Sequence, residues 1–221
     1  MPDLTFQITG AEAKPFALVP TLVFRLQIRN SLAHEEVYSA ALRCQVMIEA
    51  VHREYDVPTQ QALVEVFGAP GRWDETLHSL LWTHLTVPLP RFAGSTLLEV
   101  PIPCTPDVEV AAGKYFLALR NGVVPLVFLF SGTVFYKGLG DAVQVTQLPW
   151  EKEATFRLPI QIWRDLMEQY HPHSTWVRVR QETFDKLCQF RACHALPTLD
   201  DCLERLVENQ PVLGALVKGG A

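Results

Sequence analysis

The stretch that decides the fold of this chain runs from Pro125 to Pro159 and reads PLVFLFSGTVFYKGLGDAVQVTQLPWEKEATFRLP. Between Leu126 and Tyr136, apolar residues fill both alternating sets of positions: Leu126, Phe128, Phe130, Val134 and Tyr136 in one, Val127, Leu129 and Phe135 in the other. Because successive side chains of a strand point to opposite faces, this predicts a central strand covered on both faces. The glycines of the next segment, 137–141, predict a tight turn.

The composition indicates a protein with a sizeable core. The chain has 221 residues, 48% of them hydrophobic, and a formal net charge of -5 without long runs of one sign. This charge pattern argues against nucleic acid or an anionic membrane surface as the main partner. The longest apolar run, Val123 to Phe130, is far shorter than the roughly 20 residues that cross a bilayer, so no membrane insertion is expected.

The N-terminus and the cysteines predict a cytoplasmic protein. No basic region followed by an apolar run opens the chain. The five cysteines are an odd number in a chain large enough to fold without disulfides, which favours reduced thiols.

Period-two patterns predict antiparallel strands through much of the first half of the chain. They cover Leu22 to Ile28, Tyr38 to Ala50, and an apparent hairpin formed by Leu81 to Leu89 with Leu98 to Ile102. Proline cannot donate a ladder hydrogen bond, so the last two strands are expected at sheet edges, as indicated by Pro88, Pro90, Pro101 and Pro103.

Helical signals are few before Pro159 and frequent after it. A short helix is predicted from Thr59 to Phe67, ending at Gly68, and another from Ala111 to Leu119. After Pro159 the apolar spacing becomes helical, and Thr198 to Asp201 is typical of a helix cap. These patterns predict an α+β fold, mainly an antiparallel β-sandwich with a helical C-terminal cap. We expect one domain over 1–210, with helices from about 160, and a flexible tail over 211–221.

The loop from Gln147 to Glu153 is the first candidate for a functional surface. It concentrates one aromatic residue, two carboxylates and one amine between two strands, as Trp150, Glu151, Lys152 and Glu153. A recognition surface would use Trp150 as its anchor and the charges to orient a partner. In the alternative, Trp150 packs on the sheet and the charges are merely solvated.

Trp82 and His84 complete the predicted partner-binding set. The strand pattern places both on the polar side of their strand, and His84 could titrate near neutral pH. No serine or aspartate stands at a diagnostic spacing to complete a catalytic triad. The sequence therefore favours a protein that is not an enzyme and needs no cofactor.

A cluster near the C-terminus is one candidate for metal ligands. It consists of Cys188, Cys193, His194 and Cys202. The spacing does not match the tight cysteine pairs of structural zinc sites, and Cys188 and Cys202 also suit apolar helix faces. No metal site is predicted.

Blocks along almost the whole chain, to about residue 205, resemble a bacterial family of unknown function associated with NiFe-hydrogenase gene clusters. The matching blocks are Pro20-Thr21-Leu22, Phe24-Arg25-Leu26, Leu42-Arg43-Cys44-Gln45, Leu81-Trp82-Thr83-His84, 111–116 with Lys114-Tyr115-Phe116, 128–136, Pro149-Trp150 and Lys152-Glu153-Ala154. The resemblance implies a cytoplasmic accessory protein whose partner is a hydrogenase subunit or maturation factor. It implies no catalytic residues. The family's tail is basic and aromatic where this chain has cysteines, which further weakens the metal hypothesis.

Three hypotheses follow. The first is a non-enzymatic interaction protein that serves a NiFe hydrogenase. The alternative is a protein that binds a small molecule or metal in a pocket between the sandwich and the C-terminal helices. The third is an enzyme that uses His84 or the pair Lys152 and Glu153, which requires these side chains to adjoin a pocket.

Overall fold

The computed structural model describes residues 1–32, 35–105, 110–138, 142–174, 177 and 179–209. The chain separates into two compact units, Met1–Ser174 and Thr175–Ala221. The expectation of one domain over 1–210 stays a prediction. The predicted tail over 211–221, and residues 139–141 of the predicted glycine turn, lie outside the described residues.

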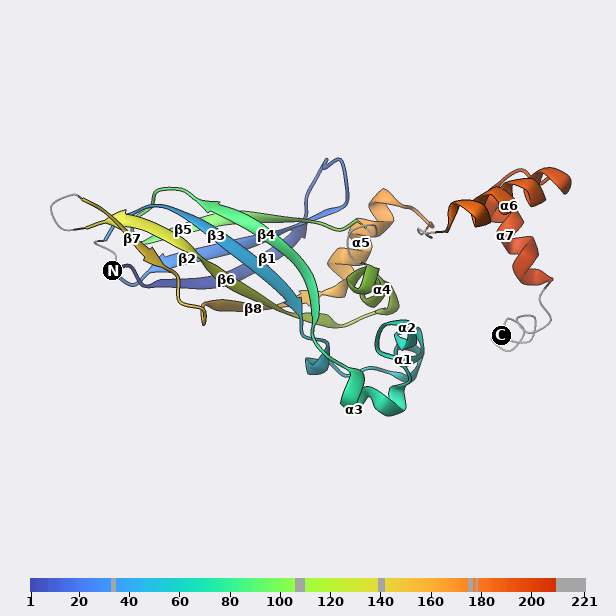
Figure 1. The fold of residues 1–221 in the computed structure, drawn as a ribbon, viewed down its shortest axis with the longest axis horizontal. Helices are drawn as coiled ribbons and strands as arrows, with labels where there is room; N and C mark the ends of the chain where they lie inside the picture. The colour runs from blue at the N-terminus through green and yellow to red at the C-terminus, as the bar shows by residue number, and fades with distance from the viewer. Residues whose placement is uncertain (33–34, 106–109, 139–141, 175–176, 178, 210–221) are drawn as a thin grey trace. The chain divides into compact units, whose positions relative to one another are not determined.

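Two antiparallel sheets form the body of the larger unit (Figure 1). The three-stranded sheet has the order β1-β2-β5, with the bounds Leu4–Ala13, Thr21–Asn30 and Ser95–Pro103. The five-stranded sheet has the order β4-β3-β6, and both β7 and β8 pair with the far side of β6. Its bounds are β3 Val37–Ile48, β4 Leu80–Leu89, β6 Val123–Lys137, β7 Val143–Gln147 and β8 Glu153–Pro159. The predicted α+β class with an antiparallel β-sandwich is confirmed.

The core lies between the sheets and is rich in aromatic rings. Phe24 of β2 makes edge-on contacts with Trp82, Phe128 and Phe156, at centroid distances of 6.0, 5.1 and 5.9 Å. These rings come from β4, β6 and β8 of the opposite sheet. Edge-to-face ring pairs add stabilisation beyond that of their buried area, so Phe24 ties the two sheets together.

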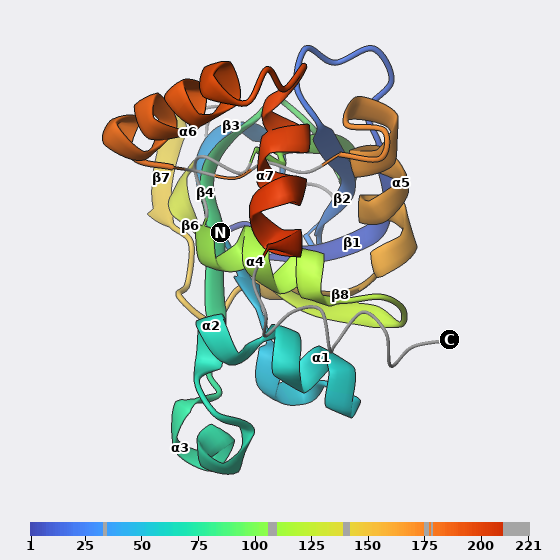
Figure 2. The same ribbon diagram turned by 90° about the vertical axis from the view of Figure 1, so that its right-hand side faces the viewer.

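Two helices close one end of the sandwich, as Figure 2 shows. They are α4, Val110–Ala118, and α5, Ile160–Tyr170. Phe116 of α4 stacks on Trp163 of α5, with 5.3 Å between the ring centroids. The centroid of Phe116 also lies 4.9 Å from that of Trp82. The apolar face predicted for the segment after Pro159 is thus the packed face of α5, on which Trp163 and Leu166 are buried.

Short helices follow β3. They are η1 Ala50–His52, α1 Val57–Ala62, α2 Val64–Phe67, η2 Pro70–Arg72 and α3 Trp73–Thr76. The cap of α1 is Asp56, which accepts a hydrogen bond from the Thr59 amide, and not Thr59 as the sequence suggested. The predicted stop at Gly68 is confirmed by its φ of 75°, which favours glycine.

The strand predictions need two corrections. First, β4 and β5 do not form a hairpin, because β4 pairs with β3 and β5 pairs with β2 in the other sheet. Between β4 and β5 the chain passes from one sheet to the other. In this connection the buried Phe92 pairs with Val37 in an isolated antiparallel β-bridge. Both strands nevertheless lie at sheet edges, as their prolines predicted.

Second, β6 is fully buried on one face only. In its inner set, Leu126, Phe128, Phe130 and Val134 are at most 2% exposed and Tyr136 is 8% exposed, whereas Val127, Leu129 and Phe135 are only partly buried. The inner set faces the three-stranded sheet, where Phe128 contacts Phe24 and Phe130 stacks on Phe6, and the second set points to the opposite face. The sequence pattern therefore identified the central strand correctly, but the prediction that both of its faces are covered was too strong, since only one face is fully buried.

The smaller unit contains α6, Gln181–Cys193, and α7, Leu199–Glu208. The predicted cap of α7 is confirmed: Thr198 accepts a hydrogen bond from the Asp201 amide, and the Asp201 carboxylate accepts one from the Thr198 amide.

Candidate functional site

The edge of the five-stranded sheet is interrupted where the predicted recognition loop lies. Strand β7 pairs with 133–137 of β6, and β8 pairs with 123–129, so both continue one edge. Between them, residues 148–152 loop outward; we call this segment the Trp150 bulge. Hydrogen bonds hold both of its ends to β6: Leu148 N donates to Gly132 O, and Phe130 N donates to Lys152 O, each at 2.8 Å. The bulge is thus a fixed feature of the sheet edge.

Gly132 allows the close packing behind this bulge. Its φ is 147°, and a Cβ placed on it would lie 2.1 Å from the carbonyl oxygen of Ala41 on β3. A side chain at this position would push β6 and β3 apart. Position 132 of β6, opposite the point where β7 ends and the Trp150 bulge begins, therefore requires glycine.

Trp150 projects from the bulge into solvent. Its exposed fraction is 88%, whereas Leu148 at the start of the bulge is buried in the core. Glu151 and Glu153 are exposed as well. The reading in which Trp150 packs on the sheet is wrong, and the geometry is that of a displayed side chain on an anchored backbone.

Lys152 differs from its neighbours because it is already paired. Its Nζ lies 2.8 Å from Oδ1 of Asp3, and its side chain is 20% exposed. Hydrogen bonds from Lys152 and Ser31 lower the pKa of Asp3. Lys152 therefore fastens the bulge to the segment before β1, and its role is to position the bulge.

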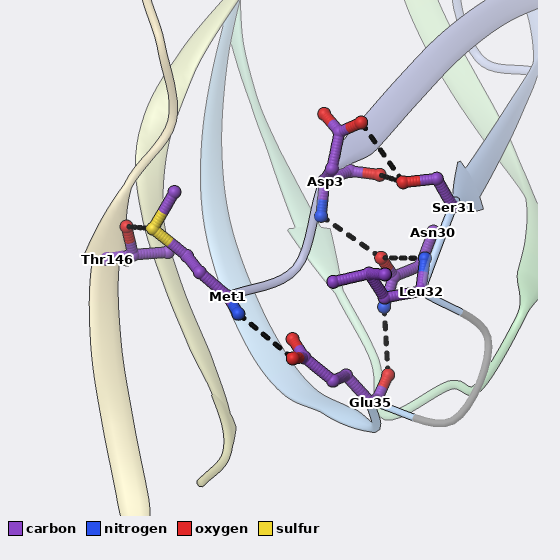
Figure 3. A network of polar contacts seen from close by, with 7 residues as sticks. All are labelled: Met1, Asp3, Asn30, Ser31, Leu32, Glu35 and Thr146. Atoms are coloured by element: carbon purple, nitrogen blue, oxygen red, sulfur yellow. Dashed lines mark hydrogen bonds and ion pairs between the residues drawn. The ribbon is translucent and has the colours of Figure 1, made fainter.

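Figure 3 shows the network that holds this N-terminal segment. Asn30, which is 4% exposed, accepts hydrogen bonds from the amides of Asp3 and Leu32 and donates one to the carbonyl of Glu35. The sulfur of Met1 accepts a hydrogen bond from Thr146 of β7. Because every polar atom of the Asn30 side chain has a partner, its burial is compensated. Sequence analysis missed this network, whose residues carry no recognisable motif.

Trp82 does not belong to the predicted surface. It is 3% exposed and packs against Phe24 and Phe116 in the core. The register of β3 and β4 shifts between Val46 and Met47, so the alternation of β4 changes phase there. The register shift in β4 turns Trp82 inward and leaves Leu81 45% exposed. The sequence-based assignment of Trp82 to the polar side of its strand was therefore wrong.

His84 is exposed but lies apart from the Trp150 bulge. The register places His84, Gln45, Leu129 and Glu153 in one row across β4, β3, β6 and β8. Three strand spacings of about 4.8 Å separate His84 from Glu153, which is roughly 14 Å. The predicted partner-binding residues thus form no single cluster.

A polar pocket of about 390 Å³ lies at the start of α1. It is lined by Arg53, Glu54, Tyr55, Asp56, Thr59 and Asn121. The Arg53 guanidinium donates to the carbonyls of Asn121 and Val123, at 2.5 and 2.6 Å, and Asp56 caps α1. Two nitrogens of the Arg53 guanidinium and the Asp56 carboxylate thus hold adjacent loops, whereas the buried Nε of Arg53 has no hydrogen-bond partner.

Tyr55, which lines this pocket and is half-buried, forms a pair with the fully buried Tyr115. The hydroxyl groups of Tyr55 and Tyr115 are 2.8 Å apart, and the Tyr55 hydroxyl also lies 2.7 Å from the Ala50 carbonyl. Burial raises the pKa of both tyrosines. Both hydroxyls therefore stay protonated at neutral pH and act as structural hydrogen-bonding groups.

The C-terminal cysteines occupy different environments. Cys202 is fully buried with its Sγ 3.8 Å from the Leu187 carbonyl, Cys188 is partly buried and Cys193 is exposed. Within the described residues, no three histidine, cysteine or carboxylate side chains converge as metal ligands. The position of Cys202 agrees with its predicted role in helix packing.

A second apolar projection was missed by sequence analysis. Phe16 and Leu18, in the loop between β1 and β2, are 99% and 101% exposed. The loop is anchored where the Tyr170 hydroxyl donates to the Ala17 carbonyl at 2.6 Å. Phe16 has a φ of 55°, which is unusual for an aromatic residue. The flanking Pro15 and Pro20 were the available signal for a constrained loop.

None of the helices in the described part of the chain is long and apolar enough to cross a membrane. No curated protein sequence matches the chain significantly. Among solved structures, the CARDB domain of a Pyrococcus furiosus protein, solved in complex with di-metal ions, is 16% identical, with a TM-score of 0.29 over 72% of this chain and 92% of that domain.

Two further structures show a similar level of likeness. A putative late embryogenesis abundant protein is 11% identical, with a TM-score of 0.29 over 72% of both chains. Beta-glucosidase 3B from Thermotoga neapolitana, solved with alpha-D-glucose, is 12% identical, with a TM-score of 0.26 over 71% of this chain and 17% of the enzyme. Such low scores carry no inference about this chain. One family model, by contrast, matches residues 1–212, and the chain therefore belongs to DUF6084, a family of unknown function.

Proposed function

We propose that this protein is a non-enzymatic interaction protein that binds a partner protein through the Trp150 bulge. The observation that carries the proposal is the 88% exposure of Trp150 on a backbone hydrogen-bonded to β6 at both ends. Tryptophan is enriched among the residues that dominate binding energy in protein interfaces.

The energetics of the bulge support this role. Burying an aromatic side chain of this size against a partner contributes on the order of 2–3 kcal/mol. An anchored backbone loses little conformational freedom when it binds, so less of that gain is offset. Glu151 and Glu153, which follow Trp150 in the chain, are exposed carboxylates and would favour a partner surface carrying basic groups around an apolar pocket.

The partner that we propose is a NiFe-hydrogenase subunit or a maturation factor. The proposal rests on the sequence blocks that resemble a family associated with hydrogenase gene clusters. Several of these blocks build the sheet that displays the bulge, including 128–136 on β6 and Pro149-Trp150 in the bulge itself.

Co-purification tests both parts of the proposal. The tagged protein would be expressed in a native host that produces NiFe hydrogenase, beside the variants Trp150→Ala and Phe16→Ala. We expect wild type and Phe16→Ala to enrich a hydrogenase component, and Trp150→Ala to recover at least about tenfold less, because an interface anchor contributes 2 kcal/mol or more.

Two outcomes would count against the proposal in different ways. If wild type enriches no hydrogenase component, the partner assignment is wrong. If Trp150→Ala recovers the partner as well as wild type while Phe16→Ala does not, the partner binds the other exposed loop.

A further inference from the structure

The sheet edges of this protein are protected to very different degrees. An open strand edge invites pairing with another strand, and proteins usually block it with prolines, charges or bulges. Strands β4 and β5 contain prolines, and β1 has an irregularity between Ile8 and Gly10. Strand β8 carries Arg157 and ends at Pro159. Strand β7, with the sequence VQVTQ, contains no charge, no proline and no glycine.

The backbone of β7 offers an ordered row of hydrogen-bonding groups on its outer side. The carbonyl of Ala142 accepts a hydrogen bond from the amide of Gly138, which follows β6, and the amide of Leu148 donates to the carbonyl of Gly132 on β6. In an antiparallel ladder alternate residues bond to the same neighbour, so Gln144 and Thr146 also face β6. The peptide groups of Val143, Val145 and Gln147 therefore point outward, and no strand of the described chain pairs with them.

Two valine side chains of β7 are exposed to solvent. Val143 and Val145 are 62% and 57% exposed, and Val145 lies beside Phe135 on the outer face of the sheet. β-branched residues of this kind are well suited to cross-strand packing. The edge of β7 that faces away from β6 can therefore pair with another strand.

We propose that β7 pairs antiparallel with β7 of a second copy of this chain, about a two-fold axis at Val145. In this register each outward amide meets an outward carbonyl, Val145 packs on Val145 of the other copy, and Val143 lies opposite Gln147. The pairing is self-complementary because an uncharged strand brings no like charges together across the axis. The five-stranded sheets of both copies then form one continuous sheet.

The short ladder predicts a weak, reversible dimer. Five residues in β7 bury much less surface than a stable interface needs, so the dissociation constant should lie in the range of about 10–100 µM. The proposal is independent of the hydrogenase partner.

Sedimentation velocity on the full chain, from about 1 to 300 µM, tests the proposal against a matched control. Wild type should show a reversible monomer–dimer equilibrium. Val145→Lys, which places like charges opposite each other at the axis, should weaken dimerisation at least about tenfold. The control Leu97→Lys changes a similarly exposed residue on the edge strand β5 and should dimerise as wild type does. A wild-type monomer throughout the range, or a dimer that Val145→Lys leaves intact, would overturn the proposal.

Amide hydrogen exchange on wild type keeps the test valid if a variant fails to fold. The amides of Val143, Val145 and Gln147 should gain protection as concentration rises, while those of Gln144 and Thr146 stay protected throughout. Exchange at the outward amides that does not change with concentration would reject pairing along β7.

Discussion

Trp82 and Trp150 stand on opposite sides of the same sheet and have opposite environments. Trp82 lies in the edge strand β4 and is 3% exposed, whereas Trp150 lies between β7 and β8 and is 88% exposed. An irregularity in strand pairing sets each position: a register shift opposite Val46 and Met47 turns Trp82 inward, and a five-residue interruption lifts Trp150 outward. The residue type does not decide the role of a tryptophan here; the local register does.

The difference separates stability from recognition within one sheet. Trp82 contacts Phe24 and Phe116, which connect the second sheet and helix α4 to β4. Trp150 adds little to the fold and is free to contact another molecule. Substitutions on the two sides should therefore have effects of different kinds.

The largest effect is expected for Trp82→Ala. The substitution removes a buried indole from the ring cluster and leaves a cavity, so the free energy of unfolding should fall by about 3–5 kcal/mol. Urea unfolding followed by circular dichroism measures this loss. A loss below about 1 kcal/mol would show that Trp82 does not pack in the core in solution.

A smaller but still large effect is expected for Gly132→Ala. The new Cβ would collide with the Ala41 carbonyl, and the φ of 147° disfavours any side chain, so the loss should be about 3 kcal/mol. The control Gly71→Ala adds a Cβ that meets no atom within 4 Å, at a glycine for which no positive φ is found, and should leave stability nearly unchanged. Equal losses in the two variants would contradict the close approach of β6 and β3.

The ion pair between Asp3 and Lys152 should contribute a small, pH-dependent stabilisation. The pKa of Asp3 is lower in the folded chain than in the unfolded chain, so its stabilisation is complete above about pH 4 and disappears as pH falls through the folded value. Asp3→Asn should cost about 0.5 kcal/mol at pH 7.

Urea unfolding from pH 7 to about pH 2 checks this prediction, because the difference from wild type should shrink as the wild-type carboxyl becomes protonated. Glu151→Gln, at an exposed carboxylate in the same bulge, serves as the control and should track wild type. A cost for Asp3→Asn that does not change with pH would indicate that the charge of Asp3 is unimportant.

The smallest effect on stability is expected for Trp150→Ala. Because the indole is exposed and both ends of the bulge are held by backbone hydrogen bonds, the change in the free energy of unfolding should stay within about 0.5 kcal/mol. The same urea titration measures it. A loss approaching that of Trp82→Ala would place Trp150 in the core.

Much of the architecture could be predicted from the sequence because strand and edge signals are local. The alternation Leu22, Phe24, Leu26 and Ile28 marks the buried face of β2, and the prolines of β4 and β5 mark edges. The cap at Thr198 depends on residues within one turn and was also predictable.

The incorrect predictions share a physical cause. Each concerns a feature that is set by pairing between segments far apart in the sequence. The register shift that turns Trp82 inward is set by β3, and the change of sheet between β4 and β5 depends on which partner each strand finds. Lys152 was predicted as a partner-binding residue, but in the fold it pairs with Asp3, which is 149 residues away in the sequence. Pattern reasoning located the loop that carries Trp150 but could not foresee what holds it.

Cross-linking mass spectrometry in hydrogenase-expressing cells tests the central claim, that the Trp150 bulge is the partner surface, most directly. Wild type should form cross-links to a hydrogenase component from Lys152 in the bulge, and Trp150→Ala should lose them while remaining folded. Cross-links that persist in Trp150→Ala, or that form from Lys14 beside the exposed Phe16 and not from the bulge, would contradict the account.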